Sequence, residues 1–152
     1  MKNLKIAIGA DHKGFDHKAA IIKKLEELGA VVKDFGPFDI TSVDYPDYAK
    51  GVCKAVQAKE CDFGILVCYT GIGMSIVANK YKSIRAALVS STENAKLTRN
   101  HNNSNVLCMG AKDTSIELAL KIVETFLSEE FEGGRHQARV DKILEVEVNE
   151  KR

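Results

Sequence analysis

Residues 63–73 read FGILVCYTGIG, a short apolar run that ends in a cysteine and is followed by a glycine-rich turn. The run Phe63–Val67 is apolar throughout rather than alternating with polar residues, which is typical of a parallel strand covered on both faces. Similar runs occur elsewhere in the chain. They predict further strands over Leu4–Gly9, Ala30–Phe35, Arg85–Val89 and Val106–Gly110.

Longer amphipathic segments alternate with these strands. Apolar residues recur at three- and four-residue steps from Phe15 to Leu28, and Gly29 follows as a stop signal. Further helices are predicted over Asp47–Ala58, Met74–Asn79, Glu93–Asn100, Ile116–Phe126 and His136–Glu147, with cap candidates at Asp113–Ser115. The alternation predicts a Rossmann-like three-layer α/β/α sandwich with a five-stranded parallel sheet and right-handed crossovers.

Length and composition indicate one domain spanning residues 1–152. The 22 Lys and Arg residues nearly balance the 21 Asp and Glu residues, so a general nucleic-acid or membrane-surface role is not expected. The four cysteines form no C-x-x-C pair, and no histidine stands at zinc-ligand spacing to them, which argues against a metal site. Apolar runs are too short for a signal core or a membrane span. We expect a cytoplasmic protein with free thiols.

Polar and reactive residues follow the predicted strands. Asp11 and His12 follow the first strand, Tyr45 lies in the loop after the second, Cys68 follows the third, and Lys112 follows the fifth. The carboxyl ends of parallel strands meet at one edge of the sheet, and ligands bind in the crevice beyond that edge. The sequence therefore predicts a site there.

Two glycine-rich stretches resemble nucleotide-binding motifs but lack required residues. Gly71–Ile76 begins like a dinucleotide fingerprint, yet its third glycine position is Ile76 and it follows the third strand rather than the first. Gly9–Gly14 has the glycine spacing of a P-loop, but Phe15 and Asp16 occupy the Lys and Ser/Thr positions. We therefore expect neither a nicotinamide or flavin site nor a nucleotide triphosphatase.

Cys68 has two interpretations. A cysteine at a strand end is often only a small buried hydrophobe, and we assign that role to Cys53 and Cys108, while Cys61 is structural or superficial. Cys68 differs because it precedes Thr70 and a glycine turn that enters a helix, where backbone N–H groups can activate a thiol or hold an oxyanion.

A low-molecular-weight phosphatase is a further possibility for a cysteine on such a loop. That chemistry requires an arginine six positions after the thiol to grip the phosphate, and Met74 stands there. The missing arginine favours Cys68 as a proton-transfer base over Cys68 as a nucleophile.

Two later segments carry binding candidates. His101 lies in Arg99–Asn105, which is dense in amides, too polar for a buried helix, and equally consistent with a helix-end loop. Arg135 and Arg139 lie four residues apart, so on a helix they share one face, and two guanidinium groups on one face suit a phosphate dianion. A solvated helix start is the alternative.

Taken together, these motifs resemble the ribose-5-phosphate isomerase B family, which includes the galactose-6-phosphate isomerase subunits. The similarity covers nearly the whole chain. The matching positions are Asp11-His12, Asp44-Tyr45-Pro46, Cys68 to Gly73, Ala78-Asn79-Lys80, Arg85-Ala86, His101-Asn102 with Asn105, and Gly133-Gly134-Arg135-His136 with Arg139.

The resemblance implies a flavodoxin-like fold with strand order 2-1-3-5-4, reversible isomerisation of ribose 5-phosphate and ribulose 5-phosphate, and no metal or coenzyme. It also implies a homodimer, or a dimer of dimers, with composite active sites near the interface. The catalytic residues would be Cys68 as the base, His101 as the ring-opening group and Thr70. The substrate-binding residues would be Asp11, His12, Tyr45, Tyr69, Gly71, Ile72, Gly73, Asn102, Lys112, Arg135 and Arg139.

Two positions depart from the family pattern. Tyr69 stands where the family usually has glycine, and Lys112 where it often has arginine. A tyrosine places a bulky ring beside the thiol, and a lysine replaces a planar fork with a point charge. A hexose-6-phosphate isomerase subunit and a non-catalytic sugar-phosphate-binding protein therefore remain alternatives.

Overall fold

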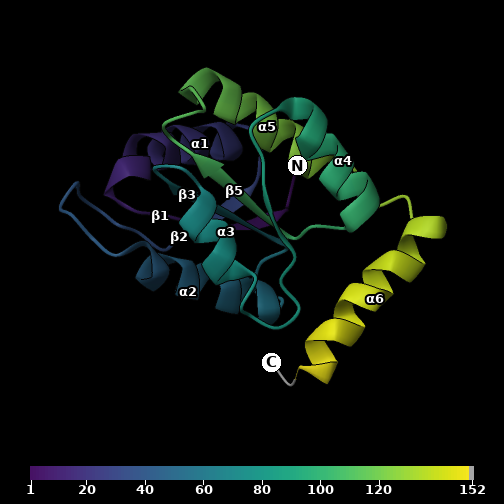
Figure 1. Cartoon of the computed structure of the whole chain (residues 1–152). Coiled ribbons are helices and arrows are strands. Elements are labelled where there is room, and N and C mark those ends of the chain that lie inside the picture. Colours follow the sequence, from purple (N-terminus) through teal and green to yellow (C-terminus); the bar gives the residue numbers. More distant parts are fainter. Residues whose placement is uncertain (151–152) are drawn as a thin grey trace.

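A parallel five-stranded sheet forms the centre of the computed structural model, which describes residues 1–150 (Figure 1). The strands are β1 (Lys5–Ala10), β2 (Val31–Asp34), β3 (Phe63–Cys68), β4 (Ala86–Leu88) and β5 (Val106–Gly110). The helices are η1 (His12–Gly14, a 3-10 turn), α1 (Phe15–Glu27), α2 (Tyr45–Gln57), α3 (Ile72–Ala78), α4 (Thr92–Asn102), α5 (Ile116–Ser128) and α6 (Arg135–Asn149). The order β2-β1-β3-β5-β4 confirms the predicted topology.

Element boundaries agree with the predicted ones to within a few residues, and two differences affect the candidate site. Tyr45 is the first residue of α2 rather than part of a loop, because Pro46 at the first turn of a helix needs no hydrogen-bond partner for its nitrogen. The helix α3 begins at Ile72 rather than at Met74, so Gly73 is helical, and Gly71 at φ 79° makes the turn before it.

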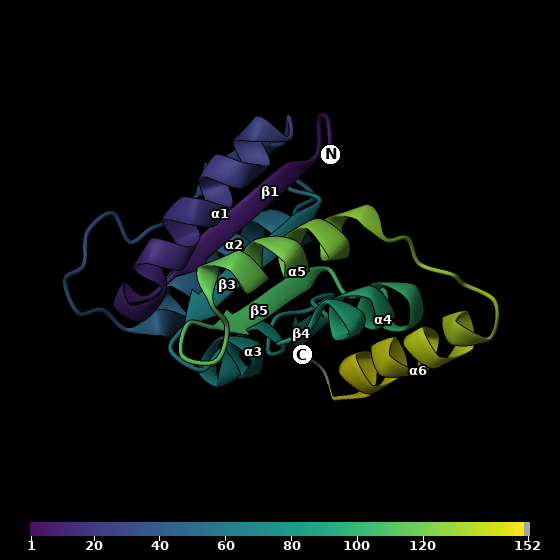
Figure 2. The same ribbon diagram turned by 90° about the horizontal axis from the view of Figure 1, so that it is seen from above.

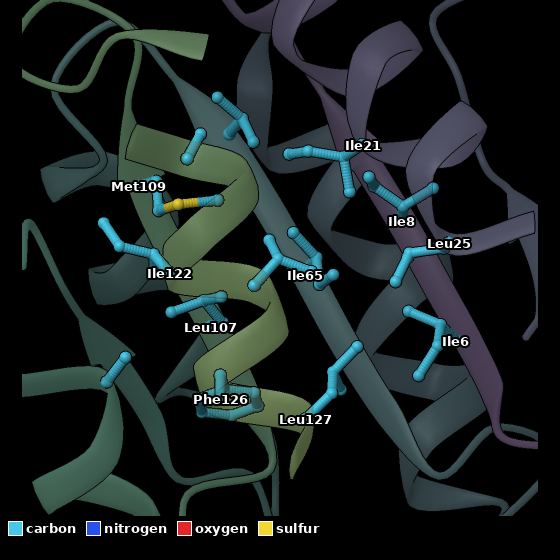
Figure 3. Packing of buried hydrophobic residues seen from close by; sticks show 14 of the residues in the cluster. Ile6, Ile8, Ile21, Leu25, Ile65, Leu107, Met109, Ile122, Phe126 and Leu127 are labelled. Carbon is cyan, nitrogen blue, oxygen red and sulfur yellow. The ribbon is translucent and has the colours of Figure 1, made fainter. Parts of the chain in front are cut away.

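Two apolar layers cover the sheet. One lies between the sheet and helices α1 and α5, and Figure 3 shows Ile21 and Leu25 of α1 with Ile122 and Phe126 of α5 against the strand residues. The other lies beneath α2 and α3. The β3 residues alternate between the two, since Ile65 and Val67 belong to the first cluster while Leu66 and Cys68 belong to the second. The predicted three-layer sandwich is confirmed.

The last helix, α6, lies outside these layers. Figure 2 shows it beside α4 and joined to α5 by an extended linker that leaves the body of the fold. Two of its apolar side chains, Ile143 and Val146, are 48% and 63% exposed. Within residues 1–150 no helix combines the length and the apolar character that crossing a membrane requires.

Candidate active site

Cys68 lies at the carboxyl end of β3, the central strand of the sheet, and is 5% exposed. Its neighbours hold it there through backbone bonds, because the Ala111 N–H donates to its carbonyl oxygen at 2.9 Å. The Gly71 N–H donates to its Sγ at 3.2 Å. A donor aimed at the sulfur stabilises negative charge that develops on it. This thiol is thus placed at the predicted ligand edge with a hydrogen-bond donor at its reacting atom.

The turn from Thr70 to Gly73 engages two of its backbone N–H groups in local hydrogen bonds. The Gly71 N–H is taken by Cys68, and the Ile72 N–H donates to Thr70 Oγ1 at 3.2 Å. A Cβ on Gly73 would lie 2.4 Å from the ring of Tyr45, so only glycine lets this tyrosine close over the turn. Within the described residues, the Gly71 N–H thus lies on the thiol, and the Ile72 N–H has a side-chain partner.

Asp11 and His12 form the adjacent wall. The Asp11 N–H donates to the Val67 carbonyl at 3.1 Å, which ties this turn directly to the strand that carries Cys68. Asp11 Oδ1 accepts the Lys13 N–H at 2.9 Å, so the carboxylate caps η1. His12 Nδ1 accepts the Val43 N–H at 3.2 Å. When neutral, the imidazole therefore carries its proton on Nε2 and can donate it to a hydroxyl or phosphate.

Tyr69 projects beside the thiol and is 49% exposed. The ammonium group of Lys13 lies 5.6 Å from the centre of its ring, within cation–π range. Its carbonyl oxygen accepts the Lys112 N–H at 2.8 Å, so the predicted phosphate-end lysine follows β5 directly opposite this residue. Tyr69 and Lys13, together with the backbone of Lys112, thus form one rim of the candidate site.

The other three cysteines are buried away from this edge. Burial raises the pKa of Cys53 to about 12, and it also raises the pKa values of Cys61 and Cys108. A thiol that stays protonated at neutral pH cannot serve as a base. The core role expected for Cys53 and Cys108 is consistent with these positions, and Cys61 is buried rather than superficial.

His101 lies toward the amino ends of the strands, at the end of the sheet opposite Cys68. It is on the last turn of α4, just before β5 begins at Val106, whereas Cys68 pairs with Gly110 at the end of β5. Four residue steps along β5 correspond to about 13 Å. Asn102 follows His101 on the same turn. A single chain therefore does not bring His101 and Asn102 to Cys68.

Arg135 and Arg139 accompany His101 rather than Cys68. Both are exposed on the first turns of α6, and between them His136 stacks on His101 with ring centroids 4.2 Å apart. The pKa of His136 is lowered by burial and then by the positive charge of Arg135. Figure 2 shows the start of α6 at the end of the molecule remote from α3. The predicted site residues thus fall into two groups at opposite ends of the sheet.

Comparisons with known proteins show the family of this chain. Residues 6–143 match the family model described as Ribose/Galactose Isomerase. The chain is 47% identical to Escherichia coli (strain K12) ribose-5-phosphate isomerase B over 143 residues, which cover 94% of this chain and 96% of that protein.

This chain belongs to the ribose/galactose isomerase family. The fold agrees closely with the structure of Clostridium thermocellum ribose-5-phosphate isomerase B, at a TM-score of 0.96, 46% identity and coverage of 97% of this chain and 100% of that chain. The ribose-5-phosphate isomerase B of Mycoplasma genitalium, in a structure with bound ribulose-5-phosphate, gives a TM-score of 0.92 at 41% identity, covering 97% and 99% of the two chains.

One sequence expectation fails at the His101 end of the family fold. The segment Arg99–Asn105 is not too polar to be buried, since Arg99 and Asn100 are 7% and 6% exposed inside α4 and its cap. Arg99 donates to the Ser104 carbonyl oxygen at 2.6 Å and stacks 4.8 Å over Phe63. Internal partners make this burial possible.

Sequence reasoning also missed two neighbours of the candidate residues. Lys13 belongs to the Tyr69 rim, and Glu132 faces His101. No local motif marks either residue, because a cation–π pair and a carboxylate on an interhelical linker depend on how distant segments meet. The fold is what brings each of them beside a candidate residue.

Proposed function

We propose that this chain interconverts ribose 5-phosphate and ribulose 5-phosphate in composite active sites, each built from two copies of the chain. The observation that carries the proposal is the position of Cys68 at the carboxyl end of β3, with a backbone N–H on its sulfur. The named relatives in the family support the substrate. The domain acts as one unit, and we assign it to the cytoplasm because all four thiols are free.

The chemistry assigned to the Cys68 edge is proton transfer between C1 and C2. A thiolate takes the proton from one carbon and returns it to the other through a cis-enediolate. The Gly71 N–H stabilises the thiolate before the first transfer and again after the second. Thr70 Oγ1 accepts the Ile72 N–H, so its own O–H remains to donate to a substrate oxygen.

Sugar and phosphate recognition is assigned to both groups of residues. Asp11, His12 and Tyr45 lie at the same end of the sheet as Cys68 and are proposed to bind the sugar hydroxyls, with Asn102 of the other copy. His101 of the other copy opens the furanose ring. Arg135 and Arg139, which lie beside that His101, hold the phosphate together with Lys112 from the Cys68 end. A remote phosphate grip fixes the reacting carbons against the base.

The separation of these groups within one chain supports the two-copy site. A sugar phosphate small enough to react at Cys68 does not reach across the length of β5 to His101 of the same chain. The exposed apolar residues Ile143 and Val146 on α6 and Ile72 and Ile76 on α3 offer surfaces that a second copy can cover. Symmetric pairing of two such chains would bring each His101 end to the Cys68 end of its partner.

A six-carbon sugar phosphate is the alternative substrate, and the position of Tyr69 next to Cys68 is the observation that favours considering it. Its half-exposed ring and the ammonium group of Lys13 form a rim directly after the thiol in the chain. This rim changes the shape available to the sugar without removing any proposed catalytic group.

A substrate panel on the purified protein tests the proposal. We expect turnover of ribose 5-phosphate to exceed that of allose 6-phosphate and galactose 6-phosphate. Tyr69→Gly is the matched variant, because it removes the rim and leaves Cys68 intact. Preference for a hexose phosphate would replace the pentose assignment, and tight binding without turnover of any sugar phosphate would favour a non-catalytic binder.

A further inference from the structure

Glu132, on the linker between α5 and α6, faces two histidines from different helices. Its Oε1 lies 3.9 Å from Nε2 of His101 and 3.5 Å from Nε2 of His136. The two imidazole rings are within 13° of parallel. Nε2 of His136 is buried and makes no hydrogen bond within the described residues. The carboxylate therefore borders a stacked pair of rings, one of which is proposed to act on substrate.

The backbone of the linker fixes the place of Glu132. Its N–H donates to the Asn100 carbonyl oxygen of α4 at 3.1 Å, and the buried Asn100 side chain donates to the Glu130 carbonyl oxygen at 2.8 Å. Gly133 follows at φ 66°, with no atom within 4 Å of a Cβ placed there, so glycine is needed for the backbone conformation rather than for space. These contacts lock the linker onto the turn of α4 that carries His101.

The same three side chains have the composition of a metal site, since their donor atoms lie within 4.8 Å of one another. An imidazole binds a metal along its nitrogen lone pair, which lies in the plane of the ring. Two nearly parallel rings with centroids 4.2 Å apart hold their lone pairs in two separate, nearly parallel planes, so a single ion beside the rings does not lie in both planes. The geometry fits a carboxylate that orients imidazoles better than it fits a metal.

We propose that Glu132 is a positioning residue that orients His101 for opening the sugar ring, with His136 as the surface on which the His101 ring rests. This inference rests on the proposed function, in which His101 opens the furanose form of ribose 5-phosphate. The side chains of Glu132 and His101 are 52% and 37% exposed, so their pairing contributes little to stability. Its effect falls on one chemical step.

Two measurements separate that step from proton transfer. Ribose 5-phosphate closes to a furanose and has to be opened before it reacts. Ribulose 5-phosphate carries its phosphate on the hydroxyl that would close a five-membered ring onto the C2 carbonyl, so it stays open. Exchange of its C1 hydrogen with D2O needs only the base and the enediolate. A defect in ring opening therefore lowers aldose turnover and spares this exchange.

The test variant is Glu132→Gln, which keeps the shape of the side chain and removes its charge. We expect kcat on ribose 5-phosphate to fall by about 10-fold or more with little change in KM. The C1 exchange of ribulose 5-phosphate, followed by NMR, stays within about twofold of wild type. Glu130→Gln is the matched control, because it makes the same change at an exposed residue of the same linker, and it keeps both rates.

The proposal is overturned if Glu132→Gln converts ribose 5-phosphate at the wild-type rate. It is also overturned if turnover of ribose 5-phosphate and C1 exchange of ribulose 5-phosphate fall equally, which would indicate general damage to the site. His101→Asn, measured in parallel, separates the two levels of the account. If His101→Asn loses aldose turnover and Glu132→Gln does not, only the positioning role fails. If His101→Asn retains full turnover, the ring-opening role of His101 in the proposed function fails with it.

Discussion

Mixing two inactive variants tests whether each active site is shared between two copies. Cys68→Ala removes the base at the carboxyl edge of the sheet, and Arg139→Ala removes a phosphate contact at the other end, where the side chain is exposed. Each pure variant lacks one component in every site, so we expect turnover to fall by about 100-fold or more in both. In a mixed dimer, one site joins the two damaged ends and the other joins the two intact ends.

The size of the recovery follows from this geometry. Equal amounts of the two variants, unfolded and refolded together, give mixed dimers as about half of all dimers, each with one intact site of two. The mixture should therefore reach about one quarter of wild-type turnover per chain. The assay is the conversion of ribose 5-phosphate to ribulose 5-phosphate, with refolded wild type as the reference. Activity no greater than the sum of the separate variants would refute the shared site.

Three further predictions concern stability. Phe126 is fully buried, and its ring packs edge-on against Phe63 with 5.8 Å between the ring centroids. Phe126→Ala should lower the free energy of unfolding by about 3–5 kcal/mol in urea titrations. A loss below about 1 kcal/mol would mean that neighbouring side chains fill the cavity. Lys18 is buried with its ammonium group 2.8 Å from the carboxylate of Asp34, which is 28% exposed and also accepts the Gly36 N–H. Lys18→Met should therefore lower the free energy of unfolding by about 2 kcal/mol. An unchanged urea midpoint would show that solvent replaces the lost bond. The lowered pKa of His136 means that the folded chain binds fewer protons than the unfolded chain as the pH falls through about 6.5. The free energy of unfolding should therefore decrease from pH 7.5 to pH 5.5. His136→Gln should make that decrease smaller, as measured by thermal unfolding at a series of pH values. If the free energy of unfolding changed with pH equally in the wild type and in His136→Gln, the lowered pKa of His136 would be contradicted.

The fold was largely predictable because its signals are local. Uninterrupted apolar runs such as Phe63–Val67 and the three- and four-residue spacing from Phe15 to Leu28 mark buried strands and amphipathic helices. The sequence predicts Tyr45 in a loop, whereas α2 begins at that residue, because the proline that follows is well suited to a first helical turn. Strand order came from the family resemblance, since no periodicity in one sequence fixes it.

The sequence predicts which candidate residues gather at the carboxyl ends of the strands, but not where the remaining candidates lie. Asp11, Tyr45 and Cys68 follow strands, and the carboxyl edge of a parallel sheet brings such residues together. His101 follows no strand, and its position at the opposite edge depends on the direction of α4. The burial of Arg99 was also hidden, because its aromatic and carbonyl partners are contributed by other parts of the fold.

The role of Cys68 as the base is the central claim, and hydrogen exchange tests it most directly. Cys68→Ala removes the sulfur that accepts the Gly71 N–H and leaves His101, Arg135 and Arg139 unchanged. We predict that exchange of the C1 hydrogen of ribulose 5-phosphate with D2O, followed by NMR, slows by about 100-fold or more while the melting temperature stays close to that of wild type. Exchange at the wild-type rate in Cys68→Ala would show that another group moves the proton.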